Sequence, residues 1–241
     1  MPRITLTRDL HQPNLIVGGC SFTYNYSTTD SSAWPSYLRD RCGFEQLFDC
    51  SRAGAGNYHI SNAIQWCIEE QDPDPSKTFV VVMWSGYNRD SVIAKANALD
   101  EVECIPNLKY NYNNQAVYLR YGDLGQLKEL KSNESRAVEN YLYVSSLYNY
   151  LQNRKIPFVF LDFLDRSLPN RTNEFDIGLY LPAKLQQRYH NMFAPVRSLY
   201  EYALHNDMLS SDDFHPSPIG HLKWTDEVLV PYLIANGVKQ S

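Results

Sequence analysis

The chain has 241 residues, of which 44% are hydrophobic, 20% charged and 13% aromatic, enough for one domain with a sizeable core. Its 22 Lys and Arg residues against 27 Asp and Glu residues give a formal net charge of −5. This balance disfavours nucleic acid as a partner, because phosphate binding requires a basic face. No apolar run approaches the roughly 20 residues of a membrane span, and the first ten residues are polar. We therefore expect a cytoplasmic protein with no signal peptide and no membrane partner.

The cysteines are five in number, scattered and without a CxxC pair: Cys20, Cys42, Cys50, Cys67 and Cys104. An odd, dispersed set is typical of reduced thiols in a cytosol-like compartment. The sequence therefore predicts neither a disulfide framework nor a zinc site.

Short apolar runs alternate with amphipathic segments along the chain. Strands are predicted at 14–18, 44–50, 78–84 and 157–161, and helices at 57–70, 134–153 and 221–236. Asn57 is the expected N-cap of the first of these helices, and Pro231 is expected to interrupt or kink the last. The run at 78–84 is apolar on both faces, which is typical of a central parallel strand. The alternation predicts an α/β fold with a parallel sheet of about five strands and helices on both faces.

Two long stretches interrupt this alternation, at about 91–133 and 163–211, and both are polar and rich in Tyr, Asn and Leu. Long insertions in such folds usually lie at the strand ends that form the active site, so we expect walls of a substrate site there. A purely structural role, in which the insertions only pack against the domain, explains these two stretches equally well. Within the first insertion, residues 109–121 are interpreted as a sugar-binding wall or as an edge hairpin without a ligand. We expect one domain over residues 1–241 that includes both insertions.

Four short segments carry candidate chemistry, and each follows a predicted strand or precedes a predicted helix. The first, at 18–23, places Ser21 in a Gly-rich turn after a strand, where a hydroxyl is exposed at the sheet edge; capping a helix is its alternative role. The second, at 49–57, is rich in small residues, whose backbone N–H groups can line an oxyanion hole or simply form a turn.

The third and fourth segments follow the same logic. At 84–89, Asn88 can donate its amide to a developing oxyanion or cap the next helix. At 212–221, Asp212 precedes His215 by three residues in a turn that Pro216 and Pro218 stiffen. A carboxylate so placed can hold the imidazole in one tautomer, which leaves its other nitrogen to accept a serine proton.

In this order, the blocks GCSFT, SRAGAGN, SGYNR and DDFHPSPIGH resemble the SGNH/GDSL hydrolase family, and they span residues 18–221. The resemblance implies a three-layer α/β/α flavodoxin-like fold and cofactor-free hydrolysis of esters. It assigns Ser21 as nucleophile, His215 as general base and Asp212 as its orienting carboxylate. The N–H groups of Ser21 and Gly54 and the side chain of Asn88 complete an oxyanion hole, with Gly56 as the alternative to Gly54.

Three positions depart from the family pattern. Cys20 replaces the usual Asp before the nucleophile, Arg89 replaces the Asp of the third block, and Asp49 replaces the Asn that leads the second block. None of these changes removes a catalytic group. They indicate a divergent branch, similar to stand-alone SGNH-like proteins encoded by tailed phages, so a virion location is a second expectation for this chain.

The predicted function is a serine esterase acting on a short-chain acyl ester, such as acetyl on a carbohydrate. The substrate is therefore expected to be a small-molecule or carbohydrate ester. Alternatives are a binding or structural module within a larger particle and an O-acyltransferase that uses the same triad. A thiol nucleophile at Cys20 is a further alternative. So is a metal site formed by His205, Asp212, Asp213, His215 and His221.

Overall fold

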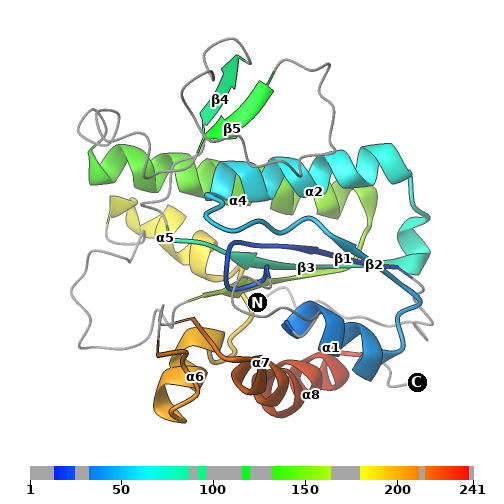
Figure 1. The fold of residues 1–241 in the computed structure, drawn as a ribbon. Coiled ribbons are helices and arrows are strands. Elements are labelled where there is room, and N and C mark those ends of the chain that lie inside the picture. The colour runs from blue at the N-terminus through cyan, green and yellow to red at the C-terminus, as the bar shows by residue number, and fades with distance from the viewer. Residues whose placement is uncertain are drawn as a thin grey trace.

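A four-stranded parallel sheet forms the centre of the molecule (Figure 1). The computed structural model describes residues 14–24, 33–86, 92–95, 116–119, 132–163, 180–211 and 215–238. The sheet has the order β2-β1-β3-β6, with all neighbours parallel. Its strands are β1 (Asn14–Gly18), β2 (Gln46–Asp49), β3 (Thr78–Trp84) and β6 (Phe158–Asp162). This order is that of a doubly wound sheet, in which the connections from β1 and β2 lead in opposite directions.

Helices cover both faces of the sheet. Figure 1 shows α2 and α4 on one face and α1, α6, α7 and α8 on the other, an α/β/α arrangement of three layers. The α-helices are α1 (Trp34–Cys42), α2 (Asn57–Gln71), α4 (Asn133–Arg154), α5 (Ala183–His190), α6 (Leu199–His205), α7 (Pro218–Trp224) and α8 (Val230–Ala235). A single 3₁₀ turn, Pro75–Lys77, precedes β3. None of the described helices is both long enough and apolar enough to cross a lipid bilayer.

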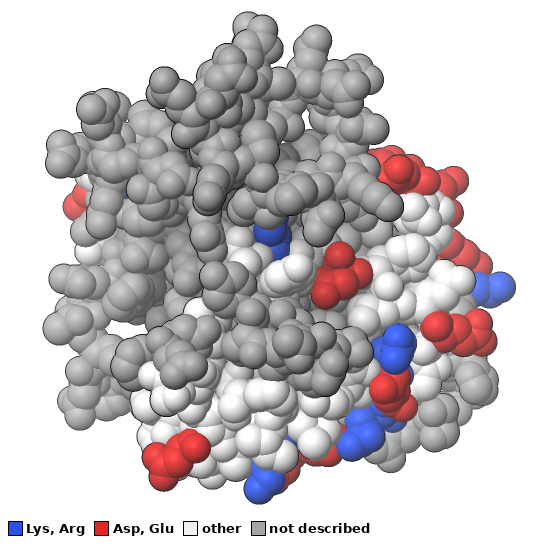
Figure 2. All heavy atoms as spheres, viewed as in Figure 1, with Lys and Arg blue, Asp and Glu red and all other residues white. Residues whose placement is uncertain are grey.

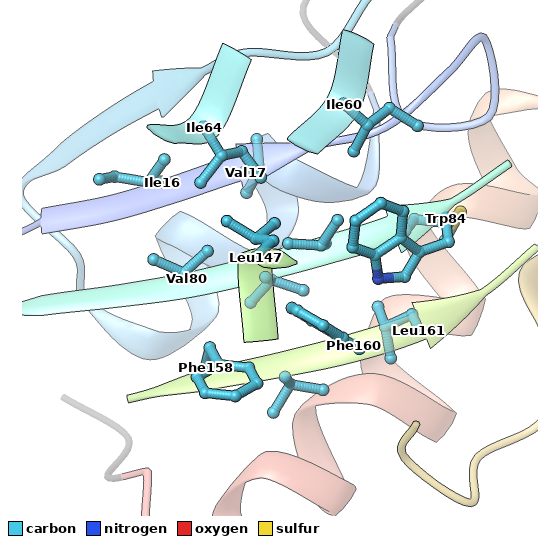
Figure 3. Close-up of a cluster of buried hydrophobic side chains, with 14 of the residues drawn as sticks. Ile16, Val17, Ile60, Ile64, Val80, Trp84, Leu147, Phe158, Phe160 and Leu161 are labelled. Carbon is cyan, nitrogen blue, oxygen red and sulfur yellow. The ribbon is translucent and has the colours of Figure 1, made fainter. Parts of the chain in front are cut away.

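The core lies between the sheet and its two helical layers. Every residue of β3 is buried, as expected for a strand with a neighbour on each side and helices on both faces. In Figure 3, Ile60 and Ile64 of α2 point toward β1, while Trp84 lies beside Phe160 of β6. The two rings meet edge to face with centroids 5.2 Å apart, a favoured geometry for aromatic pairs.

The predicted elements of the sheet and its flanking helices are confirmed, with small shifts at their ends. The strands at 14–18 and 78–84 are found with the predicted bounds, and β2 is shorter than the predicted 44–50. The described residues form four strands of the central sheet, against about five expected. Asn57 is not the N-cap of α2: Gly56 occupies that position, and Asn57 is the first helical residue.

The C-terminal helix begins earlier than predicted, at Pro218 instead of 221. Its interruption lies just before Pro231, where Thr225–Leu229 form a π-helical turn between α7 and α8. Because proline has no N–H, it cannot continue the i→i−4 hydrogen bonds of an α-helix. The predicted break is therefore a change of helical pitch within one continuous helical segment.

Both predicted insertions contain regular elements. Val92–Lys95 (β4) and Ala116–Leu119 (β5) pair antiparallel in a separate two-stranded sheet, and α5 and α6 lie within 163–211. On the described part of the surface in Figure 2, Lys and Arg side chains are interspersed with Asp and Glu.

Candidate functional site

The carboxyl ends of β1, β2 and β3 bring three of the four predicted segments together. Ligands in doubly wound sheets bind outside these ends, at the point where the strand order reverses. Backbone hydrogen bonds fix the first two segments side by side: Cys50 N–H donates to the carbonyl of Val17 (2.8 Å), and Arg52 N–H donates to that of Gly19 (3.1 Å). The first and second segments are thus one rigid unit.

The nucleophile candidate lies on a tight helical turn directly after β1. The carbonyl of Cys20 accepts from the N–H groups of Thr23 (2.9 Å) and Tyr24 (2.8 Å), so the chain coils as soon as it leaves the strand. A Cβ on Gly19 would lie 1.9 Å from Thr23 Oγ1, so a glycine is required for this turn to close. The turn buries the Cys20 side chain completely, whereas Ser21 retains 8% exposure.

Gly54 forms the bend of the second segment. Its φ of 74° lies in the left-handed region, and Ala55 N–H donates to the carbonyl of Arg52 across the bend (3.1 Å). Within the described residues, the backbone N–H groups of Ser21 and Gly54 donate no hydrogen bond to another backbone carbonyl. Backbone N–H groups without a backbone acceptor are the kind of donor that an oxyanion hole uses.

His215 reaches Ser21 from the far end of the chain. Its Nε2 lies 2.8 Å from Ser21 Oγ, so the hydroxyl donates to Nε2 when the ring proton is on Nδ1. The backbone of His215 is held by a short antiparallel pairing: Ser210 N–H donates to the His215 carbonyl (2.7 Å), and Ser217 N–H donates to that of Met208 (2.8 Å). Nucleophilic catalysis by a serine uses a contact of this kind between a hydroxyl and an imidazole.

An aromatic cluster packs around the imidazole. The Phe22 ring stacks on His215 with centroids 4.9 Å apart and planes inclined by 29°. Phe22 also contacts the rings of Phe163 (5.5 Å) and Tyr200 (5.9 Å). These contacts fix the orientation of the ring on one side.

The third segment continues from the end of β3 with Ser85, whose backbone forms hydrogen bonds with the buried side-chain amide of Asn57. Ser85 N–H donates to Asn57 Oδ1 (2.8 Å), and Asn57 Nδ2 donates to the Ser85 carbonyl (2.9 Å). Asn57 is 1% exposed. Its side chain therefore joins the start of α2 to the end of β3.

Two further histidines, His221 and His59, are buried and neutral. Burial, with a smaller effect from His215, lowers the pKa of His221 to about 3, and Trp34 N–H donates to its Nδ1 (3.4 Å). Burial and the charge of Arg52 lower the pKa of His59 to about 4. Neither ring carries a charge at neutral pH.

Of the five predicted site residues, the structure brings Ser21 and His215 into direct contact, and Gly54 lies on the segment that backbone hydrogen bonds join to the turn of Ser21. Asn88 and Asp212 lie outside the described residues, as does Asp213. The alternative nucleophile Cys20 is wholly buried. Among the described residues, no three His, Cys, Asp or Glu side chains form a group that can hold a metal ion.

Sequence reasoning missed Phe22 and Asn140. Phe22 was signalled only by its place after Ser21. Asn140 Oδ1 accepts a hydrogen bond from Asn57 Nδ2, and its position on α4 lies between the buried residues Ala137 and Val144 at helical spacing. A polar residue within an apolar stripe is the signal for a buried hydrogen-bond network.

No model of a protein family matches the chain, and no curated protein matches its sequence. Solved structures do match its fold. TesA has a TM-score of 0.56 at 13% identity, with 92% of this chain and 99% of TesA covered. The psychrotrophic esterase EstA from Pseudoalteromonas sp. has a TM-score of 0.55 at 11% identity, with 93% and 98% covered.

A structure described as a lipolytic protein of the G-D-S-L family from Desulfitobacterium hafniense DCB-2 is similar at a TM-score of 0.53 and 12% identity, with 93% of this chain and 99% of that chain covered. These likenesses extend over nearly the whole of each chain. The chain has the SGNH/GDSL hydrolase fold, and the predicted fold class is confirmed.

Proposed function

We propose that this protein is a serine ester hydrolase that acts through an acyl-enzyme at Ser21. The observation that carries the proposal is the 2.8 Å contact between Ser21 Oγ and His215 Nε2, at the sheet edge where ligands of such folds bind. In this turn Cys20 is fully buried and Ser21 is 8% exposed. A hydroxyl held against an imidazole in this way is set up for proton transfer and attack.

In the proposed reaction, Ser21 Oγ attacks the acyl carbonyl carbon while its proton passes to His215 Nε2. The tetrahedral oxyanion accepts hydrogen bonds from the N–H groups of Ser21 and Gly54 and from the amide of Asn88. Its collapse breaks the bond to the alcohol, which leaves with the proton from His215. Water then attacks the acyl-enzyme, with His215 again as base and Asp212 orienting the ring, and the carboxylic acid is released.

The proposed substrate is a short acyl ester, such as acetyl on a carbohydrate. Tyr and Asn are abundant in the insertions at 91–133 and 163–211, and these residue types stack on and hydrogen-bond to sugars. A lipase acting at an interface requires a broad apolar face, which the composition of these insertions does not favour.

The test compares acetyl and dodecanoyl esters of one chromogenic alcohol as substrates for the wild type, Ser21→Ala and Cys20→Ala. We expect faster turnover of the acetyl ester, a loss of about 10⁶ in kcat for Ser21→Ala and at least a tenth of wild-type activity for Cys20→Ala. A preference for dodecanoyl would contradict the substrate class. A Ser21→Ala variant with a tenth of wild-type activity would contradict the nucleophile.

A further inference from the structure

The residue that follows β3, Ser85, is held by a side chain instead of by a neighbouring strand. The pairing of β3 with β1 ends at Val82 with Gly18, and its pairing with β6 ends at Trp84 with Asp162. The peptide groups of Ser85 therefore lie beyond both ladders. Asn57 engages both of them, since its Oδ1 accepts from Ser85 N–H and its Nδ2 donates to the Ser85 carbonyl. A carboxamide that pairs in this way replaces the missing strand neighbour.

The orientation of the Asn57 amide is itself fixed. Its Nδ2 also donates to Asn140 Oδ1, and Asn140 Nδ2 donates to the carbonyl of Arg136 one turn earlier on α4 (2.8 Å). Because the Arg136 carbonyl can only accept, the Asn140 amide oxygen must face Asn57. All donors and the acceptor of the buried Asn57 amide thus have partners, and an amide flip would break three hydrogen bonds.

The chain positions on either side of this contact are those of the proposed oxyanion hole. Gly54 lies three residues before Asn57, and Asn88 lies three residues after Ser85. We infer that Asn57 is a positioning residue that sets the two loops carrying the Gly54 and Asn88 donors relative to each other. The inference rests on the proposed function, because it concerns the transition state of that reaction. Asn57 acts through Ser85 and does not touch the substrate.

The expected kinetic signature is a loss of kcat with little change in KM. Misplacing a donor by about 1 Å weakens an interaction that forms only in the transition state, and such displacements cost about 10²-fold. We expect Asn57→Ala to lower kcat by about 10- to 100-fold. Asn57→Ser adds no charge and retains a hydroxyl that can make one hydrogen bond, so its loss should be smaller, and it is the second variant if Asn57→Ala does not fold.

The deciding experiment is a double-mutant cycle between Asn57→Ala and Asn88→Ala, with acetyl ester hydrolysis as the readout. If Asn57 acts through the oxyanion hole, its effect on kcat should fall below about threefold once Asn88 is already alanine. Asn62→Ala is the matched control, because among the described residues the Asn62 side chain hydrogen-bonds to the carbonyl of Tyr58 on its own helix and to no other group, and it should leave kcat unchanged.

An equal loss in both backgrounds, or a raised KM at unchanged kcat, would overturn the inference and reduce Asn57 to a purely structural residue. These outcomes require an active wild type in which Ser21→Ala abolishes hydrolysis. A wild type without esterase activity would instead contradict the proposed function, and the inference with it.

Discussion

The Phe22 ring stacks on the imidazole of His215, 4.9 Å between centroids, directly beside the serine that the imidazole contacts. In the proposed reaction the imidazole becomes a cation as it accepts the serine proton. An aromatic face attracts a cation more strongly than a neutral ring. The residue after the proposed nucleophile therefore supports the base both before and during proton transfer.

Phe22→Leu should lower kcat for ester hydrolysis by about 2- to 13-fold, since such stacks contribute about 0.5–1.5 kcal/mol. Leucine retains much of the apolar bulk and removes the ring. Phe44→Leu is the control, because Phe44 stacks on Phe79 (6.2 Å) at the start of β2 and β3, the end of the sheet opposite Ser21. Equal kcat losses in the two variants would contradict the role of the Phe22 ring.

Gly54→Ala should affect both stability and turnover. An alanine held at a φ of 74° costs about 1–2 kcal/mol, and relief of this strain would shift the N–H group assigned to the oxyanion hole. Gly43 has a φ of 70° at the C-cap of α1, so Gly43→Ala is a matched control with similar strain at a distance. We expect both variants to lose about 1 kcal/mol in urea unfolding and only Gly54→Ala to lose kcat, by at least about tenfold. A loss of kcat in both would indicate a general effect of destabilisation.

His221 makes the fold sensitive to acid. Because burial lowers its pKa to about 3 from 6.5, only the unfolded chain binds this proton between those values. Above pH 6.5, His221 therefore does not change the free energy of unfolding. Below pH 6.5, protonation of His221 in the unfolded chain lowers the free energy of unfolding, increasingly so as the pH falls toward 3.

His221→Asn places an amide oxygen where Nδ1 accepts from Trp34 N–H and removes the ionisation. Urea unfolding at pH 7.5 and 4.5 should show a smaller loss of stability on acidification in the variant, by about 3 kcal/mol. His59 titrates in both proteins and cancels in this difference. Identical losses in the two proteins would contradict the lowered pKa of His221, because they would show that folding does not change it.

Sequence patterns predicted the sheet and its main helices because their apolar periodicity is strong. The run at 78–84 and the helix beginning at 57 are clear examples. Helix α1 was missed, because its nine residues contain Pro35 and three charges, and α5 and α6 are short, polar-faced helices within an insertion. Local pattern cannot replace the tertiary contacts that stabilise such helices.

The residues of the candidate site were harder to predict from local sequence patterns than the helices and strands. Ser21 and His215 are 194 positions apart, and only the resemblance of four ordered blocks to a known family connected them. Asn57 was predicted only as a helix cap. Its contact with Ser85 was missed because it spans 28 residues and no local pattern indicates it. Polar contacts between distant loops follow from the fold, not from periodicity.

The most direct test of the account is covalent labelling of the folded protein by a fluorophosphonate, followed by mass spectrometry of the intact chain and its peptides. We expect one adduct per chain, located on Ser21, no adduct in Ser21→Ala, and labelling slower by at least about 10³-fold in His215→Ala, because the hydroxyl then lacks its base. Wild-type labelling rates in either variant, an adduct at another residue, or no adduct on the wild type would contradict a nucleophilic Ser21 activated by His215.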